Sequence, residues 1–262
     1  MHNSIGQNWL LLRGLSREAG HWGEFLPLLQ SRFPLAQIHT LDLPGTGKRH
    51  RETSSCNINK ITKSVRAQAL SLNLLKQPLT ILSLSLGGMV TWEWMLKYPE
   101  DICAAALINT SQASLSPFYH RLRWQSYPNF FKLITQPNRF KRELAVIQYV
   151  ANNRVLDDKT AKEWARIQAE RPVSFKNSFR QITAAARYRP EDRKPAAPVL
   201  LLSSRGDRLV APACSEAIAK KWQLQLHTHP WAGHDLTLDD GAWAVDRLQS
   251  WTELLRNESS VI

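Results

Sequence analysis

Residues 80–89 read T-I-L-S-L-S-L-G-G-M, and this stretch decides the fold of the chain. The apolar run from Leu79 to Leu84 predicts a buried strand that stops at Ser85. Two glycines follow at once, and apolar residues at helical spacing then predict a helix over residues 88–96. The stretch therefore predicts a strand, an abrupt turn with a serine at its apex, and a helix.

The residues around Ser85 are small, as such a turn requires. A large side chain two positions from the apex would collide with the neighbouring backbone, and Ser83 and Gly87 occupy those positions. The motif is Ser-x-Ser-x-Gly in place of the Gly-x-Ser-x-Gly of a nucleophile elbow, with Gly88 just beyond it. Five residues are a short match, so the prediction depends on what the chain places beside Ser85.

The chain alternates between strand-like and helix-like segments on both sides of this turn. Short apolar runs predict strands at residues 8–12, 37–41, 79–84, 103–108, 198–203 and 224–229. Helical spacing predicts helices at residues 21–33, 59–75, 88–96, 212–222 and 239–255. This alternation predicts an α/β fold with a mostly parallel sheet of about six strands and helices on both faces.

One long interval departs from the alternation. Residues 112–190 contain no convincing strand, but amphipathic stretches at residues 139–150, 159–170 and 175–186 predict helices separated by prolines. We therefore predict a core domain formed by residues 1–111 and 191–262. Residues 112–190 are predicted to form a helical cap, or lid, which we call the cap segment.

Composition and charge limit the class of protein. The 262 residues are 43% hydrophobic and 21% charged, as expected for one α/β domain with an insertion. The absence of an 18-residue apolar run or a signal-like N-terminus, together with three cysteines lacking metal-like spacing, predicts a cytoplasmic protein without a membrane span. The net charge is +12, but residues 111–194 hold 17 Lys and Arg against 7 Asp and Glu. Basic character confined to one internal segment does not indicate a nucleic-acid partner.

Three reactive side chains follow the ends of predicted strands. Ser85 follows the third strand, Asp207 the fifth and His234 the sixth, and the carboxyl ends of parallel strands share one edge of a sheet. A serine hydroxyl needs a base to become a nucleophile, and histidine suits that task. A carboxylate fixes the imidazole tautomer and stabilises the imidazolium. These residues therefore predict a catalytic triad.

Structural roles are the alternative for each of these residues. Ser85 could be a turn serine, Asp207 could cap the helix that follows it, and His234 could be a loop histidine. His227 and His229 alternate on a predicted strand, but no third ligand is in view, so we expect a structural role for both. We therefore expect neither a metal nor a cofactor.

The sequence resembles the serine hydrolases of the α/β-hydrolase superfamily over essentially its whole length. The matching motifs, in chain order, are L-L-R-G at 11–14, D-L-P-G-T-G at 42–47, the turn at Ser85, G-D-R-L-V at 206–210 and A-G-H-D at 232–235. The family usually has His-Gly where this chain has Arg13-Gly14, which affects the packing of that loop more than catalysis. The family's first two strands have almost no room before Trp9, so the sheet is expected to be trimmed to six.

The resemblance implies further site residues and a reaction class. The oxyanion hole would consist of the backbone N–H groups of Leu15 and Leu86, and Trp22 would border the substrate pocket. A serine nucleophile implies acyl transfer to water, so a carboxylesterase, thioesterase or lactonase is expected. Other chemistry on the same fold stays open, namely a C–C hydrolase, a perhydrolase or an acyltransferase, as does a non-catalytic binding protein.

The positive charge of the cap segment bears on whether this protein binds a protein partner. The segment is either an ordinary solvated surface or a docking site for an acidic protein, because complementary charge raises encounter rates. In size and layout the chain is similar to the pimeloyl-acyl carrier protein methyl ester esterases, which dock their acidic carrier through cap arginines. That resemblance makes the following residues docking candidates: Arg139, Arg142, Arg154, Arg166 and Arg180.

Overall fold

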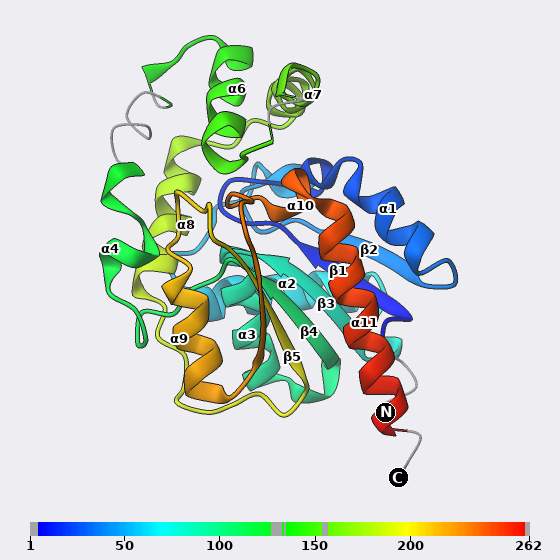
Figure 1. Ribbon diagram of the computed structural model, residues 1–262. Coiled ribbons are helices and arrows are strands. Elements are labelled where there is room, and N and C mark those ends of the chain that lie inside the picture. Colours follow the sequence, from blue (N-terminus) through cyan, green and yellow to red (C-terminus); the bar gives the residue numbers. More distant parts are fainter. Residues whose placement is uncertain (1–4, 127–132, 134, 154–156, 260–262) are drawn as a thin grey trace.

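A computed structural model describes residues 5–126, 133, 135–153 and 157–259 of the chain. Its centre is a six-stranded, all-parallel sheet with the order β2-β1-β3-β4-β5-β6 (Figure 1). The strands are Asn8–Leu12 (β1), Gln37–Leu41 (β2), Leu79–Leu84 (β3), Ile102–Ile108 (β4), Val199–Ser204 (β5) and Gln225–His229 (β6). The predicted parallel sheet of about six strands is confirmed.

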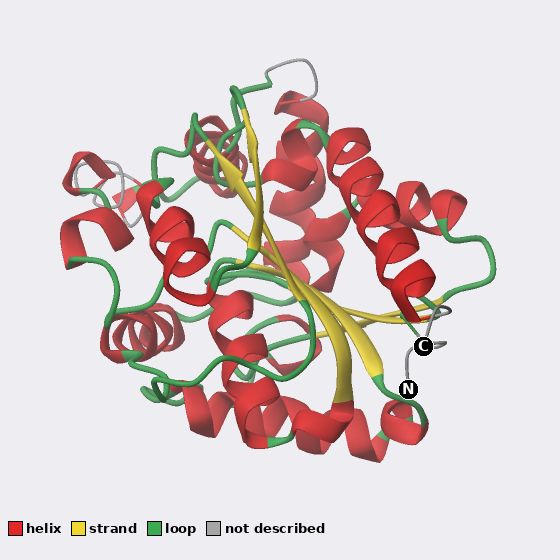
Figure 2. Cartoon of the chain, turned by 60° about the horizontal axis from the view of Figure 1, so that its bottom comes forward, coloured by secondary structure: helices red, strands yellow, loops and turns green. Residues whose placement is uncertain are grey.

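The central strands are buried because helices cover both faces of the sheet (Figure 2). One face packs against a cluster that includes residues of α2 (Ile58–Ser71), α3 (Leu86–Lys97) and α9 (Ala213–Trp222). The other face packs against α1 (Phe25–Arg32), α10 (Leu236–Asp239) and α11 (Gly241–Ser259). Every residue of β3 is buried, and β3 is a central strand of the sheet. Ser85, which follows β3, therefore lies near the middle of the edge formed by the carboxyl ends of the strands.

Between β4 and β5 the described residues form helices and no strand. These helices are α4 (Phe118–Arg121), α6 (Arg139–Val150), α7 (Asp157–Glu170) and α8 (Phe175–Arg187). Asn138 and Ser174 begin α6 and α8 by accepting the backbone N–H of the residue three positions on, which satisfies one free donor of each first turn. Helices α6 and α7 lie beyond the edge of the sheet, at the top of Figure 1.

Most predicted helices agree with the observed ones to within one or two residues at each end, and three differ more. The helix expected at residues 59–75 ends at Ser71. The helix expected from His21 begins at Phe25, because residues Ala19–Trp22 form a separate 3-10 turn (η2) in which His21 Nδ1 accepts the N–H of Glu18. The closing helix is divided into α10 and α11 at Asp240. The remaining 3-10 turns are Gly47–Arg49, Leu74–Lys76, Pro99–Asp101 and Trp124–Ser126.

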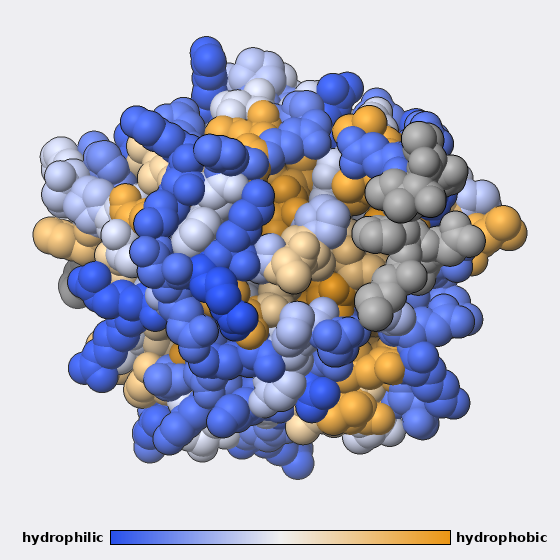
Figure 3. Space-filling model, turned by 90° about the horizontal axis from the view of Figure 1, so that it is seen from below, coloured by the Kyte–Doolittle hydropathy of each residue, from blue (hydrophilic) through white to orange (hydrophobic). Residues whose placement is uncertain are grey.

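The face seen from below is mostly hydrophilic, with hydrophobic residues in separate patches (Figure 3). None of the helices in the described part of the chain has the length and hydrophobicity that crossing a bilayer requires.

Candidate active site

Ser85 occupies a strained position between β3 and α3. Its φ is 56° and its ψ is −113°, a region that residues other than glycine rarely adopt. Two hydrogen bonds hold this conformation: Ser85 N donates to Ile108 O (2.8 Å), and Thr110 Oγ1 donates to Ser85 O (2.9 Å). Ile108 ends the neighbouring strand β4 and Thr110 lies two residues beyond it, so this strand and the loop after it fix the serine turn.

Glycines make this turn sterically possible. A Cβ at Gly87 would lie 2.6 Å from Leu12 O, which is backbone and has little freedom to move. A Cβ at Gly14 would lie 3.2 Å from the Cβ of Ser85, so the loop after β1 approaches the serine closely. Ser83 is fully buried, and its hydroxyl has no hydrogen-bond partner among the described residues. The close approach therefore explains Gly87 and Gly14, whereas no contact requires the hydroxyl of Ser83.

The structure brings Asp207 and His234 into direct contact. Asp207 follows β5, His234 follows β6, and His234 Nδ1 lies 2.7 Å from Asp207 Oδ2, with both residues buried. The other carboxylate oxygen, Oδ1, accepts the backbone N–H groups of Leu209 (2.7 Å) and Val210 (2.9 Å). An ionised carboxylate only accepts hydrogen bonds, so we assign the shared proton to Nδ1. The Nε2 atom of His234 is then the free acceptor.

Asn109 ties the histidine loop to the strand beside Ser85. It directly follows β4, and its side-chain amide donates to the carbonyl oxygens of His234 (2.9 Å) and Gly233 (3.3 Å) and to Ser204 Oγ (3.0 Å). Sequence reasoning missed this residue. A polar side chain at the end of a buried strand was the available signal, the same signal that identified Ser85, Asp207 and His234.

The hydroxyl of Ser85 makes no hydrogen bond with any residue of the described chain, His234 included. The backbone N–H groups of Leu15 and Leu86 likewise have no acceptor within the described residues. Leu86 is the first residue of α3, where a helix lacks internal acceptors for its N–H groups. Leu15 follows Gly14, whose backbone lies against Ser85. Donors of this kind are free to bind negative charge that develops on a reacting oxygen.

Arg13 forms a buried ion pair beside the histidine. Its guanidinium donates to both carboxylate oxygens of Asp235, at 3.3 and 2.5 Å, and both side chains are 3% exposed. Burial alone would raise the pKa of Asp235, but the charge and hydrogen bonds of Arg13, with a hydrogen bond from Thr237, lower it below its usual value. Arg13 therefore joins the loop after β1 to the loop that carries His234.

Two further ion pairs join the loop after β1 to the cap segment. Arg17 pairs with Glu143 of α6 (2.6 Å), and Glu18 pairs with Arg171, directly after α7 (2.7 Å). Between them His21 packs against Trp164 of α7, with ring centroids 4.9 Å apart. Burial, followed by the charges of Arg17 and Arg13, lowers the pKa of His21 well below its usual value, so this ring stays neutral.

The remaining predicted residues, Trp22 and the docking arginines, lie in separate parts of the molecule. Trp22 is buried in the core under the guanidinium of Arg13, 4.8 Å from its ring centroid, and also packs against Phe25. The docking candidates lie on three helices of the cap segment: Arg139 and Arg142 on α6, Arg166 on α7 and Arg180 on α8. Arg154 lies outside the described residues.

The two histidines of β6 have separate surroundings. His229 is buried, with Nε2 3.2 Å from Asp240 Oδ2 and Nδ1 accepting the N–H of Ala232. His227 contacts Gln225 instead. In the part of the chain that the structure describes, no three His, Cys, Asp or Glu residues are grouped closely enough to hold a metal ion.

A parallel sheet covered on both faces, with a serine in a strained strand-to-helix turn at its carboxyl edge, is the architecture of α/β hydrolases. The sequence model of the alpha/beta hydrolase family matches residues 9–247, so the chain belongs to this family.

Solved structures with the same fold include esterases and thioesterases. The chain is similar to the esterase RhEst1 from Rhodococcus sp. ECU1013, with a TM-score of 0.78 and 16% identity over 97% of this chain and 92% of that one. It is also similar to the RedJ thioesterase of the prodiginine biosynthetic pathway in Streptomyces coelicolor, with a TM-score of 0.64 and 14% identity over 97% and 87% of the two chains. At these identities the likeness shows the fold alone. Membership of the alpha/beta hydrolase family supports a hydrolase.

A curated relative matches over a shorter stretch. Over 70 residues, which are 26% of this chain, the sequence is 39% identical to a homoserine O-acetyltransferase from Pelobacter propionicus. The match spans 18% of that protein's length.

Proposed function

We propose that this protein is a serine hydrolase that cleaves a carboxylic ester or thioester through an acyl-enzyme intermediate. The observation that carries the proposal is the buried 2.7 Å contact between His234 Nδ1 and Asp207 Oδ2 at the sheet edge where Ser85 occupies its strained turn. Family membership adds support, because the order Ser, Asp, His along the chain is that of α/β hydrolases.

Each side chain has a distinct role in this mechanism. Ser85 Oγ attacks the acyl carbonyl carbon while His234 Nε2 takes its proton, and Asp207 stabilises the resulting imidazolium. The free N–H groups of Leu15 and Leu86 would donate to the oxyanion. The attack gives a tetrahedral intermediate, and its collapse to the acyl-enzyme expels the alcohol or thiol, which receives the proton from His234. A water molecule, activated by the same histidine, then releases the acid and restores Ser85.

Hydrolysis of p-nitrophenyl butyrate tests the proposal. Ser85→Ala is expected to lower kcat by about 10⁴-fold or more, because the remaining site lacks the nucleophile. A serine-directed phosphonate should add one adduct to the wild-type protein and none to this variant. Ser83→Ala is the matched control, since it removes a buried serine hydroxyl two residues away. Equal slow hydrolysis by wild type and Ser85→Ala would contradict catalysis and favour a non-catalytic binding protein.

Acyl transfer to an alcohol is the second candidate function, favoured by the stretch shared with a homoserine O-acetyltransferase. Both reactions begin with the same acyl-enzyme and differ in the acceptor that releases it. The ratio of alkyl ester to free acid, measured while a primary alcohol is titrated into the reaction, separates them. A hydrolase yields mainly acid at millimolar alcohol, whereas a transferase yields mainly ester.

We further propose that residues 112–190 form the cap over this site and that its basic helices receive an acidic acyl carrier. Arg139 and Arg166 are exposed, so both are accessible to a partner. Reversing them to glutamate should weaken binding of an acyl carrier protein and flatten its salt dependence. Binding that survives the reversal, or that never occurs at low salt, would contradict docking.

A further inference from the structure

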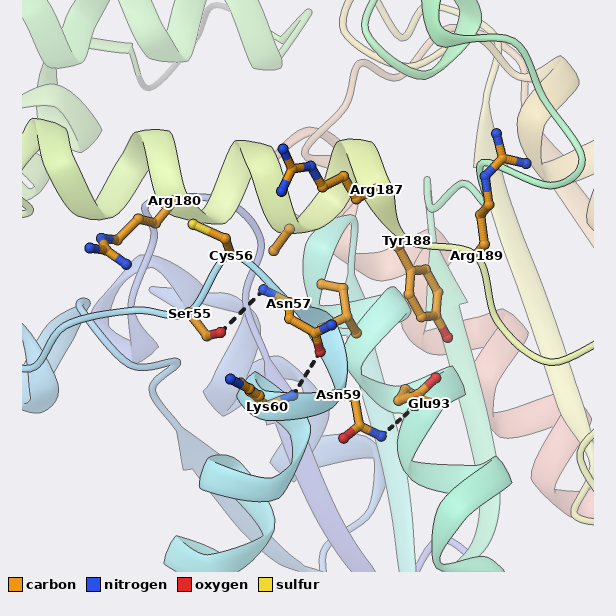
Figure 4. Close-up of a pocket in the computed structure, with 12 residues that line it drawn as sticks. Ser55, Cys56, Asn57, Asn59, Lys60, Glu93, Arg180, Arg187, Tyr188 and Arg189 are labelled. Atoms are coloured by element: carbon orange, nitrogen blue, oxygen red, sulfur yellow. Dashed lines mark hydrogen bonds between the residues drawn. The ribbon is translucent and has the colours of Figure 1, made fainter.

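An open cavity of about 490 Å³ lies between the N-terminus of α2 and the C-terminal half of α8, with α3 alongside (Figure 4). Its lining does not include Ser85, Asp207 or His234. A volume of this size is typical of sites for small organic molecules and exceeds what a single inorganic anion fills.

Three unpaired cations surround the cavity. Lys60 comes from α2, and Arg180 and Arg187 come from α8, where their spacing of seven residues places them two turns apart on one face. None of the three forms a salt bridge or a side-chain hydrogen bond with a described residue. Arg189 also lines the cavity, but Figure 4 shows its guanidinium directed away from α2. Cations left unpaired around one hollow indicate an anionic ligand.

The N-terminus of α2 adds backbone donors to this region. Asn57 caps the 14-residue helix by accepting the N–H of Lys60 (3.1 Å). The N–H groups of Ile58 and Asn59 have no acceptor within the described chain. Free N–H groups at the positive end of a helix dipole bind phosphate well, and guanidinium groups match its oxygens.

The opposite part of the cavity has different chemistry. Glu93 of α3 is 7% exposed and accepts a hydrogen bond from Asn59 Nδ2 (2.7 Å), and Figure 4 shows it near the ring of Tyr188. Tyr188 is 5% exposed, and its hydroxyl interacts with the neighbouring Glu93 carboxylate, but it makes no hydrogen bond of ordinary length and angle with any described residue. A buried carboxylate repels phosphate but accepts hydrogen bonds from hydroxyl groups, and a buried hydroxyl without an ordinary hydrogen bond calls for a polar partner.

We propose that this cavity binds a small phosphorylated polyhydroxy compound, that is, a sugar phosphate. The phosphate would lie against Arg180, Arg187 and the N-terminus of α2, and the hydroxyl groups would face Glu93 and Tyr188. Burial, together with the neighbouring charge of Glu93, raises the pKa of Tyr188 well above its usual value, so its hydroxyl keeps the proton that it would donate. This binding site is independent of the chemistry proposed for Ser85.

Isothermal titration calorimetry at low salt tests the assignment with glucose 6-phosphate, inorganic phosphate and glucose as probes. Wild type is expected to bind glucose 6-phosphate, inorganic phosphate at least tenfold more weakly, and glucose not measurably. Arg180→Gln with Arg187→Gln should weaken glucose 6-phosphate binding by tenfold or more. Arg139→Gln with Arg166→Gln removes the same charge from cap helices outside the cavity and should leave the affinity unchanged.

Tyr188→Phe tests the other part of the cavity. The hydroxyl makes no hydrogen bond of ordinary length and angle in the folded protein, so the variant should unfold close to the wild-type temperature. It should bind glucose 6-phosphate several-fold more weakly and inorganic phosphate as wild type does. A second measurement uses Cys56, which lines the cavity: glucose 6-phosphate should slow its alkylation, followed by mass spectrometry, in wild type and not in the double arginine variant.

Three outcomes would overturn the proposal. The first is a wild-type protein that binds neither phosphorylated probe. The second is an equal loss of affinity in the Arg180/Arg187 and Arg139/Arg166 variants, which would indicate general charge attraction. The third is equal affinity for inorganic phosphate and glucose 6-phosphate, which would remove the role of the hydroxyl groups.

Discussion

At the scale of single residues, the Arg13–Asp235 pair explains a departure of this sequence from its family. Arg13 stands where the family usually has histidine, and its guanidinium reaches across to the residue that follows His234. An arginine can span these two loops with two hydrogen bonds, which a single imidazole cannot do. Both side chains are nearly inaccessible to water, so removing either one would leave the other as an unpaired buried charge.

Arg13→Met is expected to lower the free energy of unfolding by about 3–5 kcal/mol, because it leaves the buried carboxylate of Asp235 without its partner. Urea denaturation at pH 7 measures the change. Arg13→Met combined with Asp235→Leu should recover most of it, since no unpaired charge then remains. The exposed pair Arg32–Asp246 is the control, and Arg32→Met should cost less than about 1 kcal/mol.

The same pair predicts a pH dependence. The pKa of Asp235 is lowered in the folded protein, so the pair stabilises the fold above the unfolded-state pKa of about 3.9 and this stability is lost as pH falls through the folded-state pKa. Between pH 5 and pH 3, wild type should therefore lose more unfolding free energy than Arg13→Met does. Parallel stability curves for the two proteins would contradict this assignment.

Asp207→Asn tests how the histidine is oriented. The asparagine oxygen can still accept the N–H groups of Leu209 and Val210, which turns its NH₂ toward His234 Nδ1. That donor favours the tautomer with the proton on Nε2, which cannot accept the proton of Ser85. We expect kcat for ester hydrolysis to fall by about 10³- to 10⁴-fold with little change in unfolding temperature. Retention of more than a tenth of the activity would show that Asp207 does not set the tautomer.

The positions of the reactive residues were predictable, whereas their supporting contacts were not. Ser85 and Asp207 each follow a mostly apolar strand, and His234 follows the more polar strand Gln225–His229, so the parallel topology places all three at one edge. Asn109 and the Arg13–Asp235 pair depend on how loops fold back over that edge. Residues 13 and 235 are 222 positions apart, and no local pattern connects them.

At the scale of elements, the serine turn makes a paired prediction. Gly87→Ala should destabilise the protein by at least about 1–3 kcal/mol, because its Cβ would meet the backbone carbonyl oxygens of Leu12 and Arg13 at 2.6 and 2.8 Å. Ser83→Ala, at the equivalent position before the serine, should be neutral or stabilising, since it removes a buried hydroxyl without a partner. Denaturation of both variants checks the pair. Equal effects would show that the two flanking positions are constrained alike.

Element boundaries were predictable where a capping residue marks them. Helix α6 has the predicted bounds, 139–150, and its cap Asn138 begins it. The predicted helix start at residue 21 was wrong, because His21 accepts a hydrogen bond from Glu18 and packs on Trp164, a residue far along the chain. Helical periodicity records which side chains are apolar, but it does not record such distant contacts.

At the scale of the whole molecule, the cap segment is joined to the core through the loop that carries Leu15. The side chain of Glu143 is 4% exposed and that of Glu18 is 3% exposed, and each pairs with an arginine on the other side of this junction. The guanidinium of Arg17 also lies 4.7 Å from the ring centroid of Trp164. Movement of α6 and α7 relative to the sheet would therefore break buried charge pairs next to the proposed oxyanion donor.

Glu143→Gln should loosen this junction without unfolding the core. Arg17 would keep its contacts with His21 and Trp164 but lose its carboxylate, so local opening of α6 and α7 should become easier by about 1.4 kcal/mol or more. Amide hydrogen exchange in these helices would then accelerate about tenfold or more, while β3 and β4 exchange as in wild type. Arg166→Gln is the matched control, because its pair with Glu170 is exposed and 3.8 Å long. If both variants exchange alike, the ion pairs do not hold the cap segment; if only Glu143→Gln opens, ester hydrolysis by this variant will show whether the junction also positions Leu15.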